Sequence, residues 1–381
     1  MTLTDISSGE SSATVAPVFD YLRRHRFKKV QLVNDTDTGL RAVIAIHSTA
    51  LGPACGGLRM WTYASEQEAI FDALRLARGM TYKYAAAGVN LGGGKAVIIG
   101  DPKTEKTEGL IRAMGRMIDQ LGGEYITGED VGTTLEDMET LYAETDHVVT
   151  LPVHCGGAGD ISPATARGSV QAMRACAQRV WGSSDLYGRT VALQGLGMVG
   201  FKAARMLVEA GARVTVTDVD PEKVSRAADE LGVGIAGPDE IYGLDVDVFA
   251  PYALGAVIND RTLQQLRVRI VAGAANNILA EDRHGDALQE RGIVYAVDYV
   301  ANSGGTIFDT DRYRKGGFQP GRATANVERI FERTLEVFEI ADRDKIGYRE
   351  AADRMAEERI AALDSVRLLD WPNTAHYPRH L

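Results

Sequence analysis

Two lysines, Lys83 and Lys95, lie twelve residues apart in a stretch that carries no other charge. Lys95 follows three consecutive glycines and precedes the apolar residues 96–99, which predict a short buried strand. A lysine beside a buried strand must find an anion, bind a ligand or lose its charge, because burying an unpaired ammonium is costly. Glycines have no side chains, so the backbone there can approach a bound molecule closely. The pattern predicts a site for an anionic substrate, with Lys95 placed for chemistry.

The alternative for both lysines is an ordinary surface position, which is the commonest fate of this residue type. To act as a base at neutral pH, Lys95 would need a pKa far below the ordinary lysine value, a difference of about 4 kcal/mol. Desolvation and a second ammonium nearby lower the pKa of a lysine, whereas a close ionised carboxylate raises it. The chemistry open to Lys95 therefore depends on the charges around it.

Two carboxylates are candidates for proton transfer. Glu129 and Asp130 follow a predicted strand at residues 124–127. They lie at the carboxyl end of that strand, where the ligand sites of α/β proteins form. Either side chain could instead cap the helix predicted at residues 135–144. We favour the capping role for Glu129 and assign proton transfer to Asp130.

A glycine-rich turn in the second half of the chain predicts a dinucleotide site. Gly195, Gly197 and Gly200 form a G-x-G-x-x-G pattern between a predicted strand and a predicted helix. The first glycine allows a tight turn, the second lets the backbone approach a pyrophosphate, and the third lets the helix pack on the strand. Asp218 ends the next predicted strand and would accept hydrogen bonds from the adenine ribose, which favours NAD over NADP. The alternative is a tight turn with Asp218 capping the following helix.

Predicted strands alternate with predicted helices along the chain, which is the pattern of an α/β fold. A glycine-rich segment follows Pro152, and we place a domain boundary there. Residues 1–151 are predicted to form an α/β substrate-binding, catalytic and oligomerisation domain. Residues 152–344 are predicted to form a Rossmann-type, doubly wound NAD-binding domain that includes a long helix at 324–341. Residues 345–381 are predicted to form a C-terminal helix that returns to the first domain, and we expect the active site where the domains meet.

Composition excludes several classes of protein. The 381 residues are 45% hydrophobic and 25% charged, as in ordinary globular proteins, and are too many for one core. The net charge of −10 argues against a nucleic-acid partner, which usually binds a basic face. No window reaches the roughly eighteen apolar residues that would indicate a membrane span. The first sixteen residues lack the features of a secretory signal, and the three cysteines show no metal-ligand spacing. We expect a cytoplasmic protein with reduced thiols and no metal.

Four segments resemble those of the amino acid dehydrogenases that act on glutamate, leucine, phenylalanine and valine. They are residues 51–61 (LGPACGGLRMW), 83–95, 129–133 (EDVGT) and 274–277 (AANN). The likeness extends over nearly the whole chain after the N-terminal tail and is nearest to the leucine and phenylalanine enzymes. The resemblance implies reversible oxidative deamination of an L-amino acid to a 2-oxo acid and ammonium, with NAD as the cofactor. It also implies a homo-oligomer.

The resemblance further implies roles for individual residues. Lys83, with the Gly57 amide, would clamp the substrate carboxylate. Lys95 would activate water and stabilise the oxyanion of the carbinolamine, and Asp130 would carry a proton to and from the amine. Asn277 would hold the carboxylate or the nicotinamide. The other implied substrate-binding residues are Gly56, Met80, Gly128, Thr306 and Asp309. The other implied cofactor-binding residues are Thr165, Met198 and Val199, beside the three glycines and Asp218.

The sequence departs from the leucine pattern at positions expected to contact the substrate side chain. Thr306 and Asp309 stand where apolar residues usually line the pocket, and Gly128 stands where leucine enzymes often have alanine, which would enlarge the cavity. Residues 154–159 are nearer to the phenylalanine enzymes and residues 351–359 to the leucine enzymes. One methylene changes specificity by only about 1–3 kcal/mol, so small differences redirect preference. We predict a branched-chain, leucine-like substrate, with phenylalanine or tryptophan as the alternative and glutamate excluded.

Two other classes of function remain open. The chain could be a catalytically silent NAD-binding protein, although retention of Lys83, Lys95 and Asp130 together argues against it. It could also oxidise 2-hydroxy acids, a reaction that usually relies on a histidine–carboxylate pair to take the hydroxyl proton. The first-half motifs contain no histidine, and the nearby His47 has the pattern of a strand residue.

Overall fold

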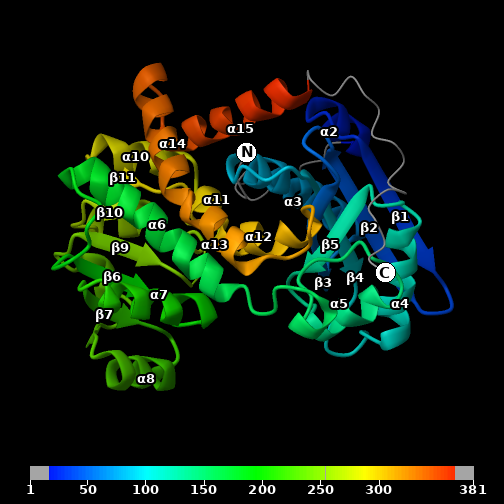
Figure 1. Ribbon diagram of the computed structural model, residues 1–381, viewed down its shortest axis with the longest axis horizontal. Coiled ribbons are helices and arrows are strands. Elements are labelled where there is room, and N and C mark those ends of the chain that lie inside the picture. Colours follow the sequence, from blue (N-terminus) through cyan, green and yellow to red (C-terminus); the bar gives the residue numbers. More distant parts are fainter. Residues whose placement is uncertain (1–16, 254, 365–381) are drawn as a thin grey trace. The chain divides into compact units, whose positions relative to one another are not determined.

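A computed structural model describes residues 17–253 and 255–364, in which strands alternate with helices along the chain (Figure 1). The fold is α/β, as predicted from the sequence. The chain divides into two compact units, which we call the N-terminal unit and the C-terminal unit. Among the described residues, the N-terminal unit comprises 17–160, 309–319 and 356–364, and the C-terminal unit comprises 161–253, 255–308 and 320–355.

The N-terminal unit is built on a mixed five-stranded sheet in the order β1-β2-β4-β3-β5. Its elements are α2 (Val18–Arg24), β1 (Lys29–Asp35), β2 (Leu40–Ser48), β3 (Ala54–Trp61), α3 (Glu66–Ala86), β4 (Gly92–Ile99), α4 (Glu108–Asp119), β5 (Tyr125–Glu129), α5 (Leu135–Tyr142) and η1 (Val153–Cys155). Strand β3 runs parallel to both β4 and β5, whereas β2 is antiparallel to β1 and β4. The register places Leu58 opposite both Ala96 and Glu129. The segments that carry Lys95 and Asp130 therefore flank β3 at the same level.

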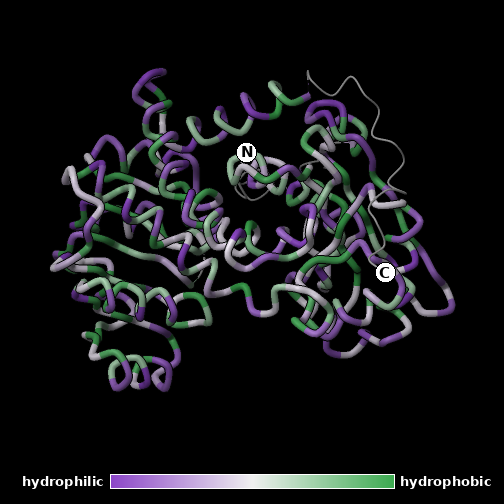
Figure 2. The backbone as a smooth tube through the Cα atoms, in the orientation of Figure 1, coloured by the Kyte–Doolittle hydropathy of each residue, from purple (hydrophilic) through white to green (hydrophobic). Residues whose placement is uncertain are grey.

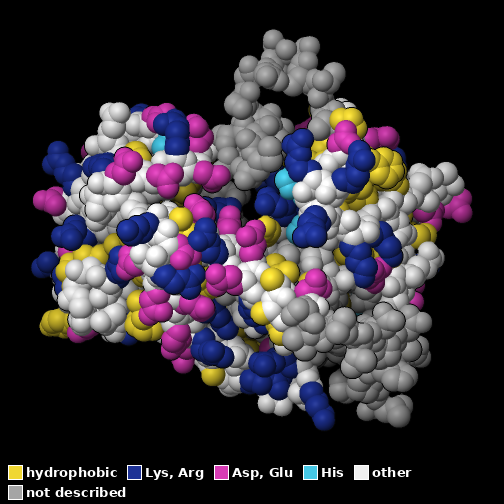
Figure 3. Space-filling model, turned by 90° about the horizontal axis from the view of Figure 1, so that it is seen from above, with side chains coloured by type: hydrophobic (Ala, Val, Ile, Leu, Met, Phe, Trp, Pro, Cys, Tyr) yellow, Lys and Arg dark blue, Asp and Glu magenta, His cyan; other side chains and the backbone are white. Residues whose placement is uncertain are grey.

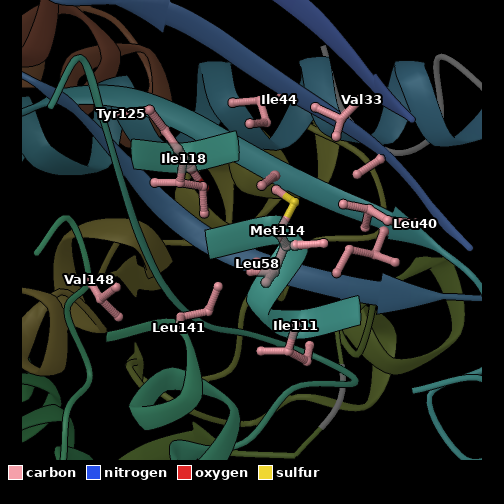
Figure 4. Close-up of a cluster of buried hydrophobic side chains, with 14 of the residues drawn as sticks. Val33, Leu40, Ile44, Leu58, Ile111, Met114, Ile118, Tyr125, Leu141 and Val148 are labelled. Carbon is pink, nitrogen blue, oxygen red and sulfur yellow. The ribbon is translucent and has the colours of Figure 1, made fainter. Parts of the chain in front are cut away.

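Alternation along the strands decides which face each side chain occupies. Leu58 of β3 and Ile98 of β4 belong to a buried cluster with α4 and α5 (Figure 4). Val97 belongs to a second cluster, which packs against α3 on the other face. Arg59 and Lys95 are the immediate neighbours of Leu58 and Ala96, which belong to the first cluster. Their side chains therefore point to the opposite face of the sheet, where α3 packs. Figure 2 shows the mainly hydrophobic course of these strands.

The C-terminal unit contains a parallel six-stranded sheet in the order β11-β10-β9-β6-β7-β8. The strands are β6 (Thr190–Gln194), β7 (Arg213–Thr217), β8 (Gly234–Ile235), β9 (Val248–Pro251), β10 (Ile270–Val271) and β11 (Val294–Tyr295). The chain moves outward from β6 through β7 to β8 and then continues on the other side of β6 with β9. This reversal defines a doubly wound Rossmann-type sheet, whose ligands bind where the strand order reverses.

The helices of the C-terminal unit differ from the prediction at one point. They are α6 (Ser162–Trp181), α7 (Met198–Glu209), α8 (Pro221–Leu231), η2 (Glu240–Gly243), α9 (Asp260–Gln265), α10 (Arg283–Glu290), α11 (Asp298–Ala301), α12 (Gly304–Asp309), α13 (Pro320–Glu328) and α14 (Ile330–Asp344). The long helix predicted at residues 324–341 is two helices, α13 and α14, separated at Arg329. Apolar periodicity continues across this break, so it did not reveal the end of α13.

The boundary between the units follows Asp160, whereas the sequence placed it after residue 151. Two later segments of the chain also belong to the N-terminal unit. The first segment contains η3 (Thr310–Tyr313), and the Tyr313 hydroxyl donates to the carbonyl of Asp146 at 2.9 Å. The second is the end of α15 (Tyr348–Asp364), where Arg359 donates to the carbonyl of Val89 at 3.1 Å. Local patterns find elements but not the unit on which a returning segment packs. Residues 1–16 and 365–381, included in the predicted domains, lie outside the described residues.

The surface carries charges of both signs. Figure 3 shows basic and acidic side chains interspersed on the displayed face. Many of them form ion pairs, such as Arg112 with Glu108 and Glu144 on the N-terminal unit. Among the helices within the described ranges, none has the length and apolar character required to cross a membrane.

Candidate active site

Lys95 lies in the middle of β4, with only 5% of its surface exposed. Its Nζ is 2.7 Å from Oδ2 of Asp130. Burial lowers the pKa of Lys95, and the positive charge of Arg59 lowers it further, while the Asp130 carboxylate opposes both effects. The net direction is downward. Lys95 is therefore a buried lysine whose ammonium form is less favoured than it would be in water, which is the direction that base catalysis requires.

Asp130 follows β5 directly and is held in a tight turn. Its main-chain N–H donates to Oγ1 of Thr133 at 3.0 Å, and the Thr133 hydroxyl donates to the carbonyl of Leu58 at 2.9 Å. Burial alone would raise the pKa of Asp130, but the charges of Lys95 and Arg59 outweigh it and keep the pKa below the ordinary value. The carboxylate is therefore ionised at neutral pH, next to the disfavoured ammonium of Lys95.

Glu129 does not cap the following helix, contrary to our prediction. The N-cap of α5 is Thr134, which forms a capping box with Asp137. The Glu129 side chain is exposed, and its pKa is raised by partial burial and by the charges of Asp309 and Asp130. The N-cap of the helix comes five residues after Glu129, because the chain first completes the turn that fixes Asp130.

The glycines around Lys95 serve mainly to let protein segments approach one another. A Cβ on Gly94 would lie 2.7 Å from the Tyr125 ring, and one on Gly93 would lie 2.1 Å from Oγ1 of Thr81. A Cβ on Gly56 would lie 1.8 Å from the carbonyl oxygen of Gly94. The expectation that residues 92–94 leave room for a substrate is therefore wrong for these positions. Strand β4 is packed too closely against α3, β5 and β3 for any side chain there.

Gly57 occupies a different position, beside the reactive groups. A Cβ on Gly57 would lie 2.8 Å from Cβ of Asp130 and 3.2 Å from Nζ of Lys95. Gly57 therefore packs closely against the Lys95–Asp130 pair, with no room for a side chain. Of the predicted substrate-binding residues, Gly57 of β3 lies beside this pair, whereas a Cβ on Gly56 would meet Gly94 and Met80.

Two more predicted residues come from the last turns of α3. This helix extends to Ala86, so Lys83 lies within its last turn. Lys83 and Met80 are both half-buried. The Cγ of Met80 would lie 3.3 Å from a Cβ on Gly56, so Met80 packs directly over β3. Helix α3 thus brings Met80 to the sheet, on the face that carries Lys95.

Gly128 and Asp309 meet at Thr150. Asp309 is buried and accepts two hydrogen bonds from Thr150, from the main-chain N–H at 2.8 Å and from the hydroxyl at 2.9 Å. A Cβ on Gly128 would lie 2.7 Å from Val149 and 2.8 Å from Oγ1 of Thr150. Gly128 therefore does not enlarge a cavity, contrary to our expectation, because Val149 and Thr150 fill the space. Thr306 lies three residues before Asp309, on α12, and is half-buried.

The glycine pattern of the C-terminal unit forms the turn from β6 into α7. Gly195 has a φ of 101° and packs against Ala253, while a Cβ on Gly200 would lie 1.9 Å from the carbonyl oxygen of Gly195. Gly197 is the N-cap of α7 and is exposed, with open space where a Cβ would point. Met198 and Val199 begin the helix. The open face at Gly197 and the free amides of the helix N-terminus fit a pyrophosphate group.

Asp218 follows β7 and binds the same turn. Its Oδ2 accepts from the N–H of Leu196 at 2.6 Å, and its Oδ1 accepts from the N–H of Asp220 at 2.9 Å. The N-cap of α8 is Asp220, so the alternative that Asp218 itself caps this helix is wrong. Beyond Asp218, a surface hollow is lined by side chains that include Val219, Val224, Ile235, Ala236 and Pro238.

Thr165 and Asn277, the remaining predicted cofactor residues, lie in the C-terminal unit. Thr165 is in the first turns of α6, half-buried beside Gly305, whose Cβ would lie 2.4 Å from Oγ1 of Thr165. Asn277 is exposed, with a φ of 51°, in the loop after β10. Asn302 donates to Oδ1 of Asn276 at 2.7 Å and so fixes the neighbouring residue of this loop.

The sequence did not reveal three residues of the site: Arg59, Asp72 and Thr150. Arg59 donates to Asp130 from Nε at 3.0 Å and to Asp72 from Nη1 at 2.8 Å. A signal for Arg59 was present, since it is a charge within a strand pattern and within the segment of densest family resemblance. Asp72 lies on α3 and Thr150 beyond β5, and nothing in their local sequences indicates these contacts.

Comparison with known proteins decides the family. Residues 24–147 match the dimerisation domain of Glu/Leu/Phe/Val dehydrogenases, and residues 156–224 and 220–366 match the glutamate/leucine/phenylalanine/valine dehydrogenase domain. The chain belongs to this family. It is therefore an amino acid dehydrogenase, an oxidoreductase that acts on small amino and 2-oxo acids.

Individual relatives cover nearly the whole chain. It is 51% identical over 350 residues to a leucine dehydrogenase of Thermoactinomyces intermedius, covering 92% of this chain and 95% of the relative. It is 47% identical over 347 residues to a phenylalanine dehydrogenase of Caldalkalibacillus thermarum, covering 90% and 93%. The crystal structure of an L-tryptophan dehydrogenase from Nostoc punctiforme matches with a TM-score of 0.82 and 40% identity, covering 91% of this chain and all of that one.

Burial of Asp309 makes the stability of the dehydrogenase depend on pH. Burial raises the pKa of Asp309 to about 6 from its ordinary value of 3.8, although the donors on Thr150 limit the rise. Below the lower value the carboxyl is neutral in both the folded and the unfolded state. As pH rises through about 6, the folded protein must bury a charge, so this contribution to stability is lost.

We expect Asp309→Asn to remove this loss. Relative to the variant, the wild type loses up to about 3 kcal/mol of unfolding free energy between pH 4 and pH 7. Urea midpoints of both proteins measured across this range test the expectation. A difference between them that does not change with pH would contradict it.

Proposed function

We propose that the enzyme catalyses the NAD-dependent, reversible oxidative deamination of a hydrophobic, leucine-like L-amino acid. The L-amino acid, NAD⁺ and water give the 2-oxo acid, ammonium, NADH and a proton. The observation that carries this proposal is the buried Lys95–Asp130 pair, at 2.7 Å, in a chain of the amino acid dehydrogenase family. The 51% identity to a leucine dehydrogenase supports the leucine-like substrate.

In this proposal the substrate carboxylate binds to Lys83 and to the main-chain N–H of Gly57. Gly57 lies directly against the pair, since a Cβ there would be 2.8 Å from Cβ of Asp130 and 3.2 Å from Nζ of Lys95. A carboxylate bound beside two lysines is held by charge-assisted hydrogen bonds. The substrate Cα then lies next to the pair that transfers protons.

The proton transfers are divided between Lys95 and Asp130. The lowered pKa of Lys95 makes its neutral form easier to reach; in that form it takes a proton from the attacking water, and its ammonium form stabilises the oxyanion of the carbinolamine. Asp130 is held ionised by its two cationic neighbours, so it accepts a proton from the substrate amine and returns it to the leaving ammonia. The direction of each pKa shift thus favours the form that accepts a proton.

The C-terminal unit provides the residues that would hold the cofactor. The open face at Gly197 and the amides at the start of α7 suit the pyrophosphate, and Asp218 suits the hydroxyls of the adenine ribose. Thr165 and Asn277 are proposed to contact the nicotinamide end. Bound NAD⁺ supplies the acceptor for the hydride.

The substrate side chain is proposed to be apolar. A buried cluster of Cys55, Tyr84, Leu91, Ile126 and Val149 lies on the sheet face of α3, with Met80 packed against it. Asp309 lies near Cys55 and Tyr84 and would repel a second carboxylate, which disfavours glutamate. An aromatic substrate is the second candidate, favoured by the 47% identity to a phenylalanine dehydrogenase.

We further propose a homo-oligomer in the cytoplasm. The family match over residues 24–147 is to a dimerisation domain, which supports self-association. All three cysteines are free thiols, two of them buried, which suits a reducing compartment.

A panel of substrates tests the proposed function. We expect NADH formation at 340 nm to be fastest with L-leucine and L-valine, slower with L-phenylalanine and L-tryptophan, and slowest with L-glutamate. Matched 2-hydroxy acids are the control and are expected to give no NADH. Activity with L-glutamate above that with the four apolar substrates would refute the substrate class, and no activity with any amino acid would indicate a silent NAD-binding protein.

Substitution of the two lysines separates binding from chemistry. We expect Lys95→Ala to lower kcat at least about 100-fold, because one oxyanion donor is typically worth that much. We expect Lys83→Ala to act mainly through a higher KM for the amino acid. Lys106→Ala is the matched control, since Lys106 pairs with Asp137 at 2.6 Å in the same unit. If Lys95→Ala kept more than a tenth of kcat, roughly, its chemical role would be wrong.

Cofactor preference tests the role of Asp218. We expect kcat/KM for NAD to exceed that for NADP by more than about tenfold, equivalent to about 1.4 kcal/mol, because a 2′-phosphate would meet this carboxylate. Asp218→Asn should narrow the ratio, whereas Asp220→Asn, at the N-cap of α8, should leave it unchanged. Equal rates with both cofactors in the wild type would show that Asp218 does not face the ribose.

A further inference from the structure

We propose that Arg59 is a positioning residue for the proton-transfer pair: it fixes the Asp130 carboxylate and competes with Lys95 for the same carboxylate oxygen. The proposal rests on the proposed function, in which Lys95 and Asp130 transfer protons. Nε of Arg59 is 3.0 Å from Oδ2 of Asp130, and Nζ of Lys95 is 2.7 Å from that same atom. Oδ2 of Asp130 therefore accepts from both cationic side chains, and these two donors set the orientation of the carboxylate.

Arg59 is itself held in place by Asp72. Nη1 of Arg59 is 2.8 Å from Oδ2 of Asp72, which lies on α3. Asp72 also accepts from the Tyr63 hydroxyl at 2.7 Å and from Nη2 of Arg75 at 2.8 Å. These three donors come from β3, from the turn after it and from α3. The guanidinium is thus locked between two carboxylates, one on each side.

The planar shape of arginine is essential to this arrangement. A guanidinium presents Nε and its two Nη atoms in a fixed fork, so it can bind two carboxylates at a set angle. A lysine at the same position has a single ammonium on a flexible chain and could hold only one of them well. Only 22% of the Arg59 side chain is exposed, so water screens the interaction weakly.

The charges around Lys95 explain why this position matters to the reaction. Lys95 faces Asp130 after β5, Arg59 on β3 and Asp72 on α3. Arg59 disfavours the ammonium form of Lys95, whereas Asp130 and Asp72 favour it. Glu129 also acts on Asp130, and Tyr63 and Arg75 face Asp72. Without Arg59, Asp130 would be paired with Lys95 alone, so the pKa of Lys95 would rise and its neutral form would become scarcer at pH 7.

The test compares Arg59→Gln and Arg59→Lys with the wild type in L-leucine oxidation at saturating NAD. In Arg59→Gln we expect the acidic limb of the plot of kcat against pH to shift to higher pH by about one unit, because a nearby positive charge is lost. Turnover at pH 7 then falls roughly tenfold and recovers at high pH, while KM changes little. We expect Arg59→Lys to return the acidic limb to its wild-type pH but not to restore the full value of kcat at high pH, because lysine carries the charge without the forked geometry of the guanidinium.

Arg112→Gln is the matched control. Arg112 on α4 also bridges two carboxylates, Glu108 from Nε and Glu144 from Nη1, each at 2.8 Å. It belongs to the helix on the opposite face of the sheet, and its substitution should leave the limb unmoved. The proposal would be overturned if the acidic limb of Arg59→Gln stayed at its wild-type pH, with kcat either lowered equally at every pH or unchanged.

A measurement without turnover separates this proposal from the proposed function. Trace labelling with acetic anhydride, followed by mass spectrometry of the peptide that contains Lys95, reports the midpoint at which this amine deprotonates. We expect the midpoint to rise by about one pH unit in Arg59→Gln and to stay unchanged in Arg112→Gln. An unchanged midpoint in Arg59→Gln overturns the role of Arg59, even if leucine oxidation is confirmed. A raised midpoint in a protein that oxidises no amino acid supports the positioning and rejects the function.

Discussion

Burial of the Lys95 ammonium against the Asp130 carboxylate is the interaction on which the N-terminal unit depends. Removing water from two charges is costly, and the cost is recovered only when their geometry is good and their other polar contacts are satisfied. The sheet provides that geometry, since β3 lies between the strands that carry the two residues. The Thr133 turn fixes Asp130, and Arg59 gives its carboxylate a second cationic donor. The pair is thus a product of strand order and register.

Close packing around the pair explains why its sequence contains so many glycines. Gly56, Gly93 and Gly94 allow β4 to contact β3, α3 and the Tyr125 ring, and none of them leaves space for a ligand. Gly57 is packed as closely, but its neighbours are Asp130 and Lys95. In the C-terminal unit Gly195 and Gly200 also pack against protein, whereas Gly197 faces open space.

Asp218, which we propose to bind the adenine ribose, also holds the scaffold. Its carboxylate accepts from Leu196 in the glycine turn and from Asp220 at the start of α8. The residue therefore joins β7 to the β6–α7 turn before any ligand is bound. Substitution of Asp218 changes both the charge presented to a cofactor and the order of the turn. Asp309 is comparable in the N-terminal unit, where it binds both the N–H and the hydroxyl of Thr150, a residue with a φ of 58°.

The sequence alone determined the α/β class and the glycine turn of the Rossmann-type unit, and it singled out Lys95 and Asp130 as candidates, because these follow from local periodicity and from short motifs. It could not place contacts between residues far apart in the chain. The capping role given to Glu129, the space expected at Gly128 and the single long helix at 324–341 were wrong, because each depends on what packs against it. Only the tertiary structure decided that Arg59 and Asp72 complete the charge cluster and that Thr150 binds Asp309. Strand order brings these residues together, and strand order is set by burial over the whole sheet rather than by any local pattern.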